Sequence, residues 1–109
     1  MAEPEYISLI HLIQHPHRYH GRKVRVIGVV RLKFESKAVF VSAEDLKKAV
    51  TKNAIWLDVD LTEANQKLSG KHVLVEGVFD QENLGHLKLY SGAITKVTRL
   101  EEWRANVKD

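Results

Sequence analysis

The sequence predicts a mainly β domain with short helices, an α+β fold whose five strands form a partly open barrel. The first observation is the stretch Gly21–Phe34, a long run of alternating residues with a glycine near its middle. The second is Gly70–Phe79, which repeats the same spacing of glycine and valine. The third is a set of short alternating runs separated by polar turns and capping motifs. Together these features favour a small, strongly bent sheet.

The 109 residues predict a single domain, with the barrel over about residues 21–98. Because the chain contains no cysteine, disulfides, thiol catalysis and cysteine-ligated metal are excluded. The first residues lack the apolar stretch of a secretory signal, and no apolar run reaches the length of a membrane span. We therefore expect a cytoplasmic protein without a membrane partner. The net charge of +3 permits a nucleic-acid partner without requiring one.

The N-terminal part predicts a loose end over residues 1–6 and then a short helix. Ser8 is a good N-cap for a helix running to His15, whose apolar residues share one face. Pro16 ends this helix, because the residue before a proline avoids the helical region. Residues 16–21 are then expected to form a connecting turn.

The first strand is expected from about Arg22 to Phe34, which is long for a strand. Its inward series contains Gly28 where a side chain would be expected, and it ends at Phe34. A glycine inside a strand marks a bulge, a bend or a close backbone approach. Such a strand can bend at Gly28 and take part in two sheets.

The middle of the chain predicts short strands and two further helices. A turn over residues 35–37 precedes a second strand, Ala38–Val41. The capping-box spacing of Ser42 and Asp45 predicts a helix over residues 43–50. Clean alternation predicts a third strand over Ala54–Asp60, and a further helix follows around Thr62–Leu68.

The last part predicts two strands and a terminal helix. The fourth strand is expected over Lys71–Phe79, and the fifth over His86–Tyr90, resuming through Ala93–Val97. A second capping-box spacing begins at Thr98 and predicts a short helix. That helix would present three apolar residues on one side: Leu100, Trp103 and Val107.

This order of elements resembles the OB-fold, a partly open five-stranded Greek-key barrel. The resemblance rests on strand order and on Gly28 and Gly77, and it implies that the first strand lies beside the fourth. The lead-in from Ser8 to His15, with Pro16, Tyr19 and Gly21, is similar to that of some uncharacterised bacterial OB-like proteins. No activity follows from that likeness.

The resemblance also implies a ligand surface on the second and third strands, between the first–second and fourth–fifth loops. The residues of this chain that fall there combine cations with aromatic rings, which suits single-stranded nucleic acid. At each aromatic position the alternative is a side chain that covers the open barrel end. The candidate residues are Arg31, Lys33, Lys37, Trp56, His86, Lys88 and Tyr90.

Two other chemistries are weaker predictions. His11 and His15 share a helical spacing, with His17 and His20 close behind, so a transition-metal site is one hypothesis and ordinary surface histidines the other. Asp58 and Asp60 share one strand face about 7 Å apart, without the cleft that acid–base catalysis requires. We therefore expect no enzyme activity, no cofactor and no metal at the predicted surface.

The function predicted first is a non-enzymatic OB-like binding module that contacts another macromolecule, most plausibly a protein. The mixed charge and the scarcity of aromatic residues favour a protein over a dedicated nucleic-acid partner. Single-stranded nucleic acid and a histidine-bound metal are the alternatives.

Overall fold

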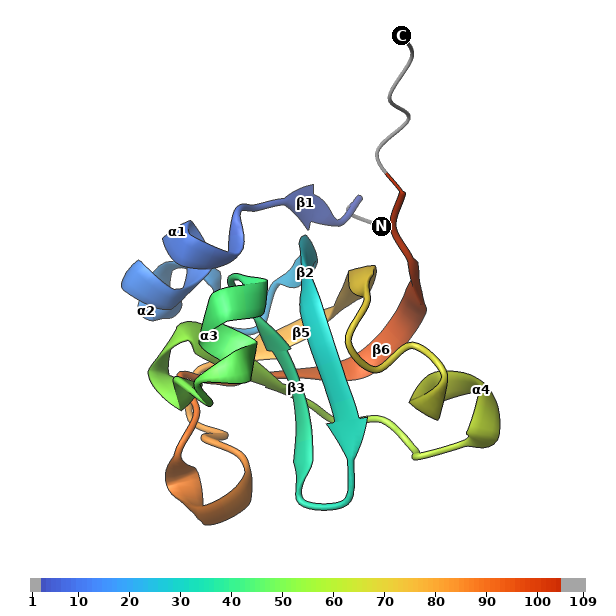
Figure 1. Cartoon of the computed structure of the whole chain (residues 1–109). Helices are drawn as coiled ribbons and strands as arrows, with labels where there is room; N and C mark the ends of the chain where they lie inside the picture. The colour runs from blue at the N-terminus through green and yellow to red at the C-terminus, as the bar shows by residue number, and fades with distance from the viewer. Residues whose placement is uncertain (1–2, 105–109) are drawn as a thin grey trace, which may run out of the picture.

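The computed structural model describes residues 3–104 and shows a mainly β fold with four short helices (Figure 1). Six strands form one mixed sheet. The strands are β1 (Glu5–Tyr6), β2 (Lys23–Lys33), β3 (Ser36–Phe40), β4 (Ala54–Leu57), β5 (His72–Asp80) and β6 (Ala93–Glu102). The helices are α1 (Leu9–Gln14), α2 (Pro16–Tyr19), α3 (Ala43–Lys47) and α4 (Glu63–Gln66), with 3-10 turns η1 (Thr51–Asn53) and η2 (His86–Lys88).

Five of the strands close into a ring that is not a regular barrel. The order around the ring is β2, β3, β4, β6 and β5, and β5 returns to β2. All ring pairings are antiparallel except that of β4 with β6, which is parallel. The short β1 lies outside the ring and pairs in parallel with the first half of β2. The predicted mainly β class and five-strand arrangement are therefore confirmed at this level.

β2 is bent (Figure 1) and changes its pairing partner next to Gly28, so it takes part in both halves of the ring, as predicted. Its first half pairs with β5, and its second half pairs with β3 from Val29 onward. A Cβ at position 28 would lie 2.6 Å from the carbonyl oxygen of Phe40 and from Cγ2 of Val39. The close approach of these strands therefore requires glycine.

The seam between β2 and β5 has a local two-fold symmetry that explains the repeated sequence. Val26 pairs with Val75 at its centre, and Gly28 pairs with Val73 just as Gly77 pairs with Val24. At its ends, the Gly21 N–H donates to the Phe79 carbonyl (2.8 Å), and the Gly70 N–H donates to the Val30 carbonyl (2.6 Å). Both Gly21 and Gly70 have positive φ, so each ends a helical turn at an equivalent point. The two copies thus meet as equivalent halves of one antiparallel pair.

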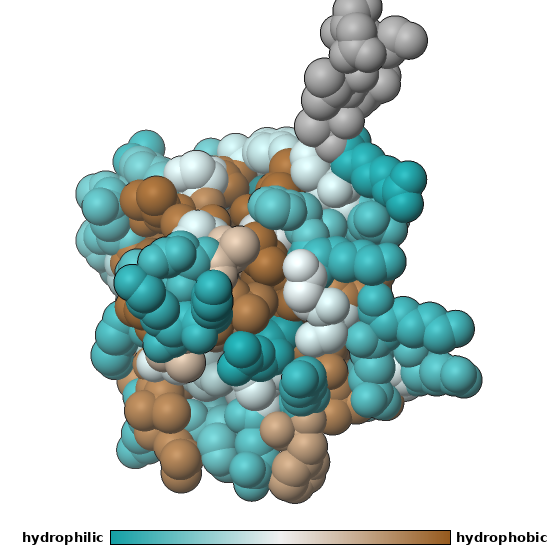
Figure 2. Space-filling model, in the orientation of Figure 1, coloured by the Kyte–Doolittle hydropathy of each residue, from teal (hydrophilic) through white to brown (hydrophobic). Residues whose placement is uncertain are grey.

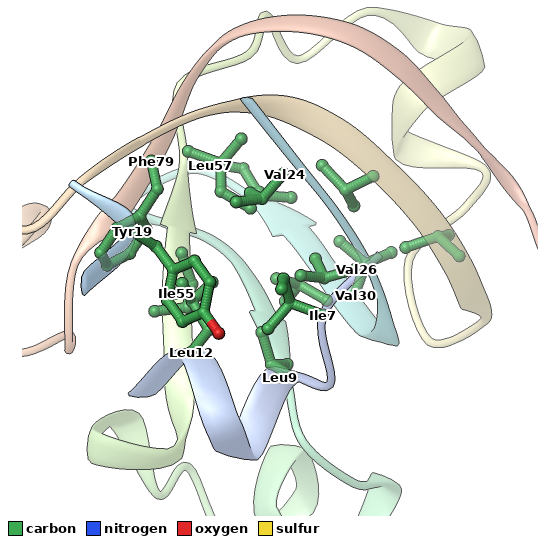
Figure 3. Close-up of a cluster of buried hydrophobic side chains, with 14 of the residues drawn as sticks. Ile7, Leu9, Leu12, Tyr19, Val24, Val26, Val30, Ile55, Leu57 and Phe79 are labelled. Atoms are coloured by element: carbon green, nitrogen blue, oxygen red, sulfur yellow. The ribbon is translucent and has the colours of Figure 1, made fainter. Parts of the chain in front are cut away.

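The core fills the ring and extends beneath the N-terminal helices. In Figure 3, Leu9, Leu12 and Tyr19 point toward the side chains of the strands, so α1 and α2 close one end of the ring. Ser8 caps α1 by accepting a hydrogen bond from the His11 N–H, as the sequence predicts. The strands contribute alternate inward residues: Val24, Val26, Val30, Leu32, Val39, Ile55, Leu57, Val73, Val75, Phe79 and Ile94.

The N-terminal segment differs from the prediction in two places. Residues 16–21 are not a simple turn, because α2 begins at Pro16. Proline suits the first helical position, where its missing N–H would have no partner within the helix. The predicted loose end contains β1, since the bend of β2 leaves an edge that Glu5 and Tyr6 pair with. The Ile7 N–H extends this contact by donating to the Arg25 carbonyl.

The predicted fifth strand is confirmed over Ala93–Val97, but the prediction is wrong for its first part, His86–Tyr90, and for the last helix. Residues 86–90 form a loop with η2, in which Leu87 and Lys88 have positive φ, and β6 begins only at Ala93. No helix starts at Thr98, because β6 continues to Glu102 along the free length of β5. Tertiary pairing overrides the capping signal here. Val107, the third apolar residue of the predicted helix, lies outside the described residues.

The middle elements agree with the sequence except in their lengths. Ser42 caps α3 and Thr62 caps α4, each by accepting a backbone N–H three residues later. β4 stops at Leu57 rather than Asp60, because its last contact with β6 is a bond from the Asp58 N–H to the Ile94 carbonyl. No helix within residues 3–104 is long and apolar enough to cross a membrane.

Candidate ligand-binding surface

The outward face of β3 and β4 carries a second, smaller apolar cluster. Tyr90 is only 3% exposed and covers this face, while Trp56 on β4 is half-buried beside it. Their ring centroids lie 5.3 Å apart. The face that the sequence assigns to a ligand is therefore largely covered by the chain's own β5–β6 loop. The cluster consists of Ala38, Phe40, Ala54 and Tyr90, with Leu46 and Trp56 packed against it.

The β5–β6 loop is fixed on this face by close packing and hydrogen bonds. A Cβ at Gly85 would lie 2.8 Å from three atoms of the Trp56 side chain, so the loop backbone rests on the indole. The Tyr90 N–H donates to the Leu84 carbonyl (3.0 Å), and the Ser91 hydroxyl donates to the Lys52 carbonyl (2.6 Å). Gly85 also has φ +71°, a conformation that glycine adopts readily.

Two polar side chains flank Trp56. The His86 ring stacks on it with an interplanar angle of 22° and a centroid distance of 6.5 Å. The Lys37 Nζ lies 5.5 Å from the indole centroid and donates to the Val59 carbonyl at 2.9 Å. Lys37, His86 and the loop backbone thus occupy the surroundings of Trp56, and they leave little of the indole for stacking with a base.

The most exposed apolar side chains lie at the tips of the two loops that flank this face. Phe34, in the β2–β3 turn, is 82% exposed, and Leu87, in η2, is 74% exposed. Leu89 is exposed beside Leu87. Figure 2 shows brown to tan knobs over both loops at the lower end of the molecule. We call this region the loop-end surface, which consists of Phe34, Glu35, Leu87, Lys88 and Leu89.

The backbone of the loop-end surface is strained. Glu35, Leu87 and Lys88 have φ between 57° and 67°, a region that costs non-glycine residues free energy. The two loops approach each other, since the His86 Nε2 lies 3.9 Å from the Glu35 Oε2. The surrounding structure therefore holds both tips in conformations that their own residues disfavour.

The structure brings most of the predicted site residues to this end of the molecule. Lys37, Trp56, His86 and Tyr90 form one contact group, although Tyr90 supports the face rather than lining it. Lys33 and Lys88 are exposed beside the two tips. Arg31 lies apart, where its guanidinium donates to the Leu46 carbonyl of α3 at 3.3 Å.

Sequence reasoning missed the residues that are most exposed. The sequence predicts Phe34 in the inward series of the first strand, but β2 ends at Lys33 and Phe34 lies in the turn. Leu87 and Leu89 were assigned to a strand. Leu87 and Leu89 alternate with His86 and Lys88 as in a strand, so the local signal for a loop was limited to Gly85 before them and Gly92 after them.

The histidines do not converge on a metal site. His11 and His15 have ring centroids 4.6 Å apart, but the His20 Nδ1 accepts the Gln81 N–H and lies near Asp80. Within residues 3–104, no group of three or more histidine, aspartate or glutamate residues could hold a metal ion.

A buried carboxylate lies on the outward face of the β2–β5 seam, away from the loop ends. Glu76 accepts hydrogen bonds from the Arg25 Nε (2.9 Å) and the Thr98 hydroxyl (3.1 Å), and Arg99 lies 3.6 Å away. Burial opposes the ionisation of Glu76. The hydrogen bonds from Arg25 and Thr98 and the two nearby guanidinium charges outweigh it, so the pKa of Glu76 is lowered. This network is satisfied within the fold, so we assign it to stability.

Comparison with known proteins gives no relative for this arrangement. No protein-family model matches the chain, and no curated protein or solved structure matches it significantly.

Proposed function

We propose that this chain is a non-enzymatic binding module of the OB-fold type that contacts another protein through its loop-end surface. The OB-fold assignment is supported by the order of the ring and by the parallel pairing of β4 with β6. The helix between the third and fourth ring strands, α4, has the same place in the predicted barrel. The elements that the simplest five-stranded OB-fold does not contain are β1, the N-terminal helices and α3.

The observation that carries the proposal is the exposure of Phe34 and Leu87 at the tips of two strained loops. Exposed apolar side chains that gather at one end of a domain are typical of an interaction surface. Folding gives no reason for their position, since neither side chain belongs to a buried cluster. Strained backbone at Leu87, and at Glu35 next to Phe34, is typical of functional sites.

The chemistry of the surface specifies the kind of partner. Lys33 and Lys88 flank the tips and form no ion pair within the described residues. A complementary partner presents apolar pockets for Phe34 and Leu87 with acidic side chains at their rims. Because few residues take part, we expect weak and transient binding.

Single-stranded nucleic acid remains the alternative, because the same lysines could contact phosphate. Against it, Trp56 is flanked by His86, Lys37 and the loop backbone, and Tyr90 is buried. Phe34 is then the main aromatic ring left for base stacking at this surface.

The test uses a photo-crosslinking amino acid at position 34 or 87 of the full chain, in extracts of the source organism. We expect the same protein to be captured from both positions, and its capture to be lost in the F34S/L87S double variant. A probe at position 10, on exposed Ile10 of α1, is the control for general stickiness. Failure to capture a common protein would overturn the proposal.

A parallel titration separates the alternative. A labelled single-stranded oligonucleotide is added at low salt, where contacts to phosphate are strongest. If the oligonucleotide binds at low salt and K33E/K88E abolishes this binding, nucleic acid rather than protein is the partner of the loop-end surface. No binding would exclude the alternative.

A further inference from the structure

The strand β6 has one edge that the ring does not use. Along its first edge, the start of β6 pairs with β4. The hydrogen bond from the Asp58 N–H to the Ile94 carbonyl (3.0 Å) is the last contact between these two strands. On its other side β6 stays paired with β5 as far as Glu102. Beyond Ile94, no strand within residues 3–104 pairs with the first edge.

β6 has a bulge shortly after its last contact with β4. The β5–β6 register shifts between Glu76 and Val78, and Lys96 in the shifted segment has φ +47°. An irregularity of this kind bends a strand and ends pairing on one side. β6 therefore leaves β4 and follows β5 alone, with its second edge open.

The backbone groups that face the open edge follow from the register. The Trp103 N–H donates to the His72 carbonyl at 2.8 Å, so Trp103 faces β5. Because backbone groups alternate along an antiparallel strand, Leu100 and Glu102 turn their N–H and C=O groups to the open edge. An extended peptide can add to such an edge as a further strand.

A hollow of about 560 Å³ lies beside this edge. One wall is the bulged part of β6, and the other is the segment that leaves β4 toward α4. Its volume falls within the usual range of ligand pockets. The lining residues on β6 are Val97, Thr98, Arg99 and Leu100, and those opposite include Asp58, Asp60 and Asn65.

The free charges in the hollow are negative. Asp58 and Asp60 are exposed, and their carboxylates form no ion pair or hydrogen bond within the described residues. The Arg99 guanidinium is already held by Glu101 at 3.0 Å and by Glu76 at 3.6 Å. The exposed Lys96 does not line the hollow. The hollow is therefore complementary to cationic side chains.

We propose that the open edge of β6 binds an extended peptide segment rich in lysine or arginine as an added strand. Leu100 and Glu102 would pair with its backbone, while Asp58 and Asp60 contact its basic side chains. This surface is separate from the loop-end surface, and the proposal does not depend on the proposed function.

The first test is fluorescence anisotropy with a labelled octapeptide of alternating lysine and valine, added to the full chain. We expect saturable binding that weakens with salt and that is about tenfold weaker in D58N/D60N. An alternating glutamate–valine octapeptide should not bind. The matched control, E82Q, removes an exposed acid elsewhere and should leave binding unchanged. Equal binding of both peptides, or of wild type and D58N/D60N, would overturn the proposal.

The second test separates strand addition from simple charge attraction. E102P removes an N–H from the open edge without removing a backbone hydrogen bond to β5. E102Q keeps that N–H and, like E102P, loses the ion pairs of Glu102 with Lys71 and Arg104. We expect E102P to lose peptide binding and E102Q to keep it, with both variants folded by circular dichroism. Amide exchange at Leu100 and Glu102 should slow when the peptide binds. Unchanged exchange at these amides with the peptide bound would contradict strand addition, even if E102P proves unstable.

Discussion

The β2–β5 seam and the loop-end surface treat backbone geometry and apolar side chains in opposite ways. At the ends of the seam, the positive-φ positions are Gly21 and Gly70, and the inward valines Val24, Val26, Val73 and Val75 are fully buried. At the loop ends, positive φ falls on Glu35, Leu87 and Lys88, and the apolar side chains face solvent. The requirements of folding thus explain the seam. At the loop ends, positive φ at non-glycine residues lowers the free energy of unfolding, and folding does not require this conformation. The loop ends are therefore the better candidate for a functional surface.

The largest expected effect is at the centre of the seam. G28V places a branched side chain where a Cβ already lies 2.6 Å from the Phe40 carbonyl, so we expect a loss of about 3 kcal/mol or more in unfolding free energy. Urea denaturation measures it. The matched control is G70A, where no atom lies within 4 Å and only φ +90° is unfavourable. We expect G70A to cost about 1 kcal/mol. Similar losses in both variants would contradict the close approach at Gly28.

The next effect concerns the charge network beside the seam. E76Q keeps the size of the side chain but removes the charge that Arg25 and Arg99 share, and we expect a loss of about 1–3 kcal/mol at pH 7. Because the folded-state pKa of Glu76 is lowered, its stabilisation is present above the unfolded-state value of about 4.3. It disappears as the pH falls through the folded-state value.

Stability measured against pH tests this assignment. The wild type should lose stability relative to E76Q as the solution is acidified below the unfolded-state pKa, and the two curves should converge. E82Q, which alters an exposed acid without an ion pair in the described structure, is the control and should follow the wild type. A constant difference between wild type and E76Q at all pH values would argue against the ion pairs.

A smaller effect is expected where the loop rests on Trp56. G85A introduces a Cβ 2.8 Å from the indole and a methyl group at φ +71°, so we expect a loss of about 1–2 kcal/mol. In a W103F background, Trp56 is the remaining tryptophan, and its fluorescence should shift as the loop moves away. An unchanged spectrum and stability would show that the loop does not pack on this ring.

The smallest effect on stability is expected at the tips themselves. F34S removes an 82% exposed ring that contributes nothing to the core, and unfolding free energy should change by less than about 0.5 kcal/mol. F79A, in the core, should cost about 3–5 kcal/mol in the same assay. A large loss of unfolding free energy in F34S would mean that Phe34 packs within the fold. The proposed difference between the seam and the loop tips would then be wrong.

Particular residues show how far local patterns can predict this protein. Alternation identified the buried face of β2 and β4, because a strand with one buried face must alternate. Ser8 and Ser42 were identifiable as helix caps, because each hydroxyl accepts a hydrogen bond from the backbone N–H three residues later. Thr98 carried an equally good capping signal, yet it lies in β6, where the residues that follow it, 99–102, pair with β5. The site was predicted in part: Lys37, Trp56, His86 and Tyr90 do meet, but the exposed tips were assigned to strands.

The sequence by itself determined the elements whose signals are local, namely the alternating strands, the capped helices and the glycines where a side chain would not fit. It also determined the repeated Gly–Val spacing that pairs β2 with β5. Only the tertiary structure decided which face Tyr90 covers, where β6 loses its second neighbour, and that Phe34 and Leu87 lie at one end. Those features depend on contacts between residues far apart in the chain, and each local segment is compatible with more than one such arrangement.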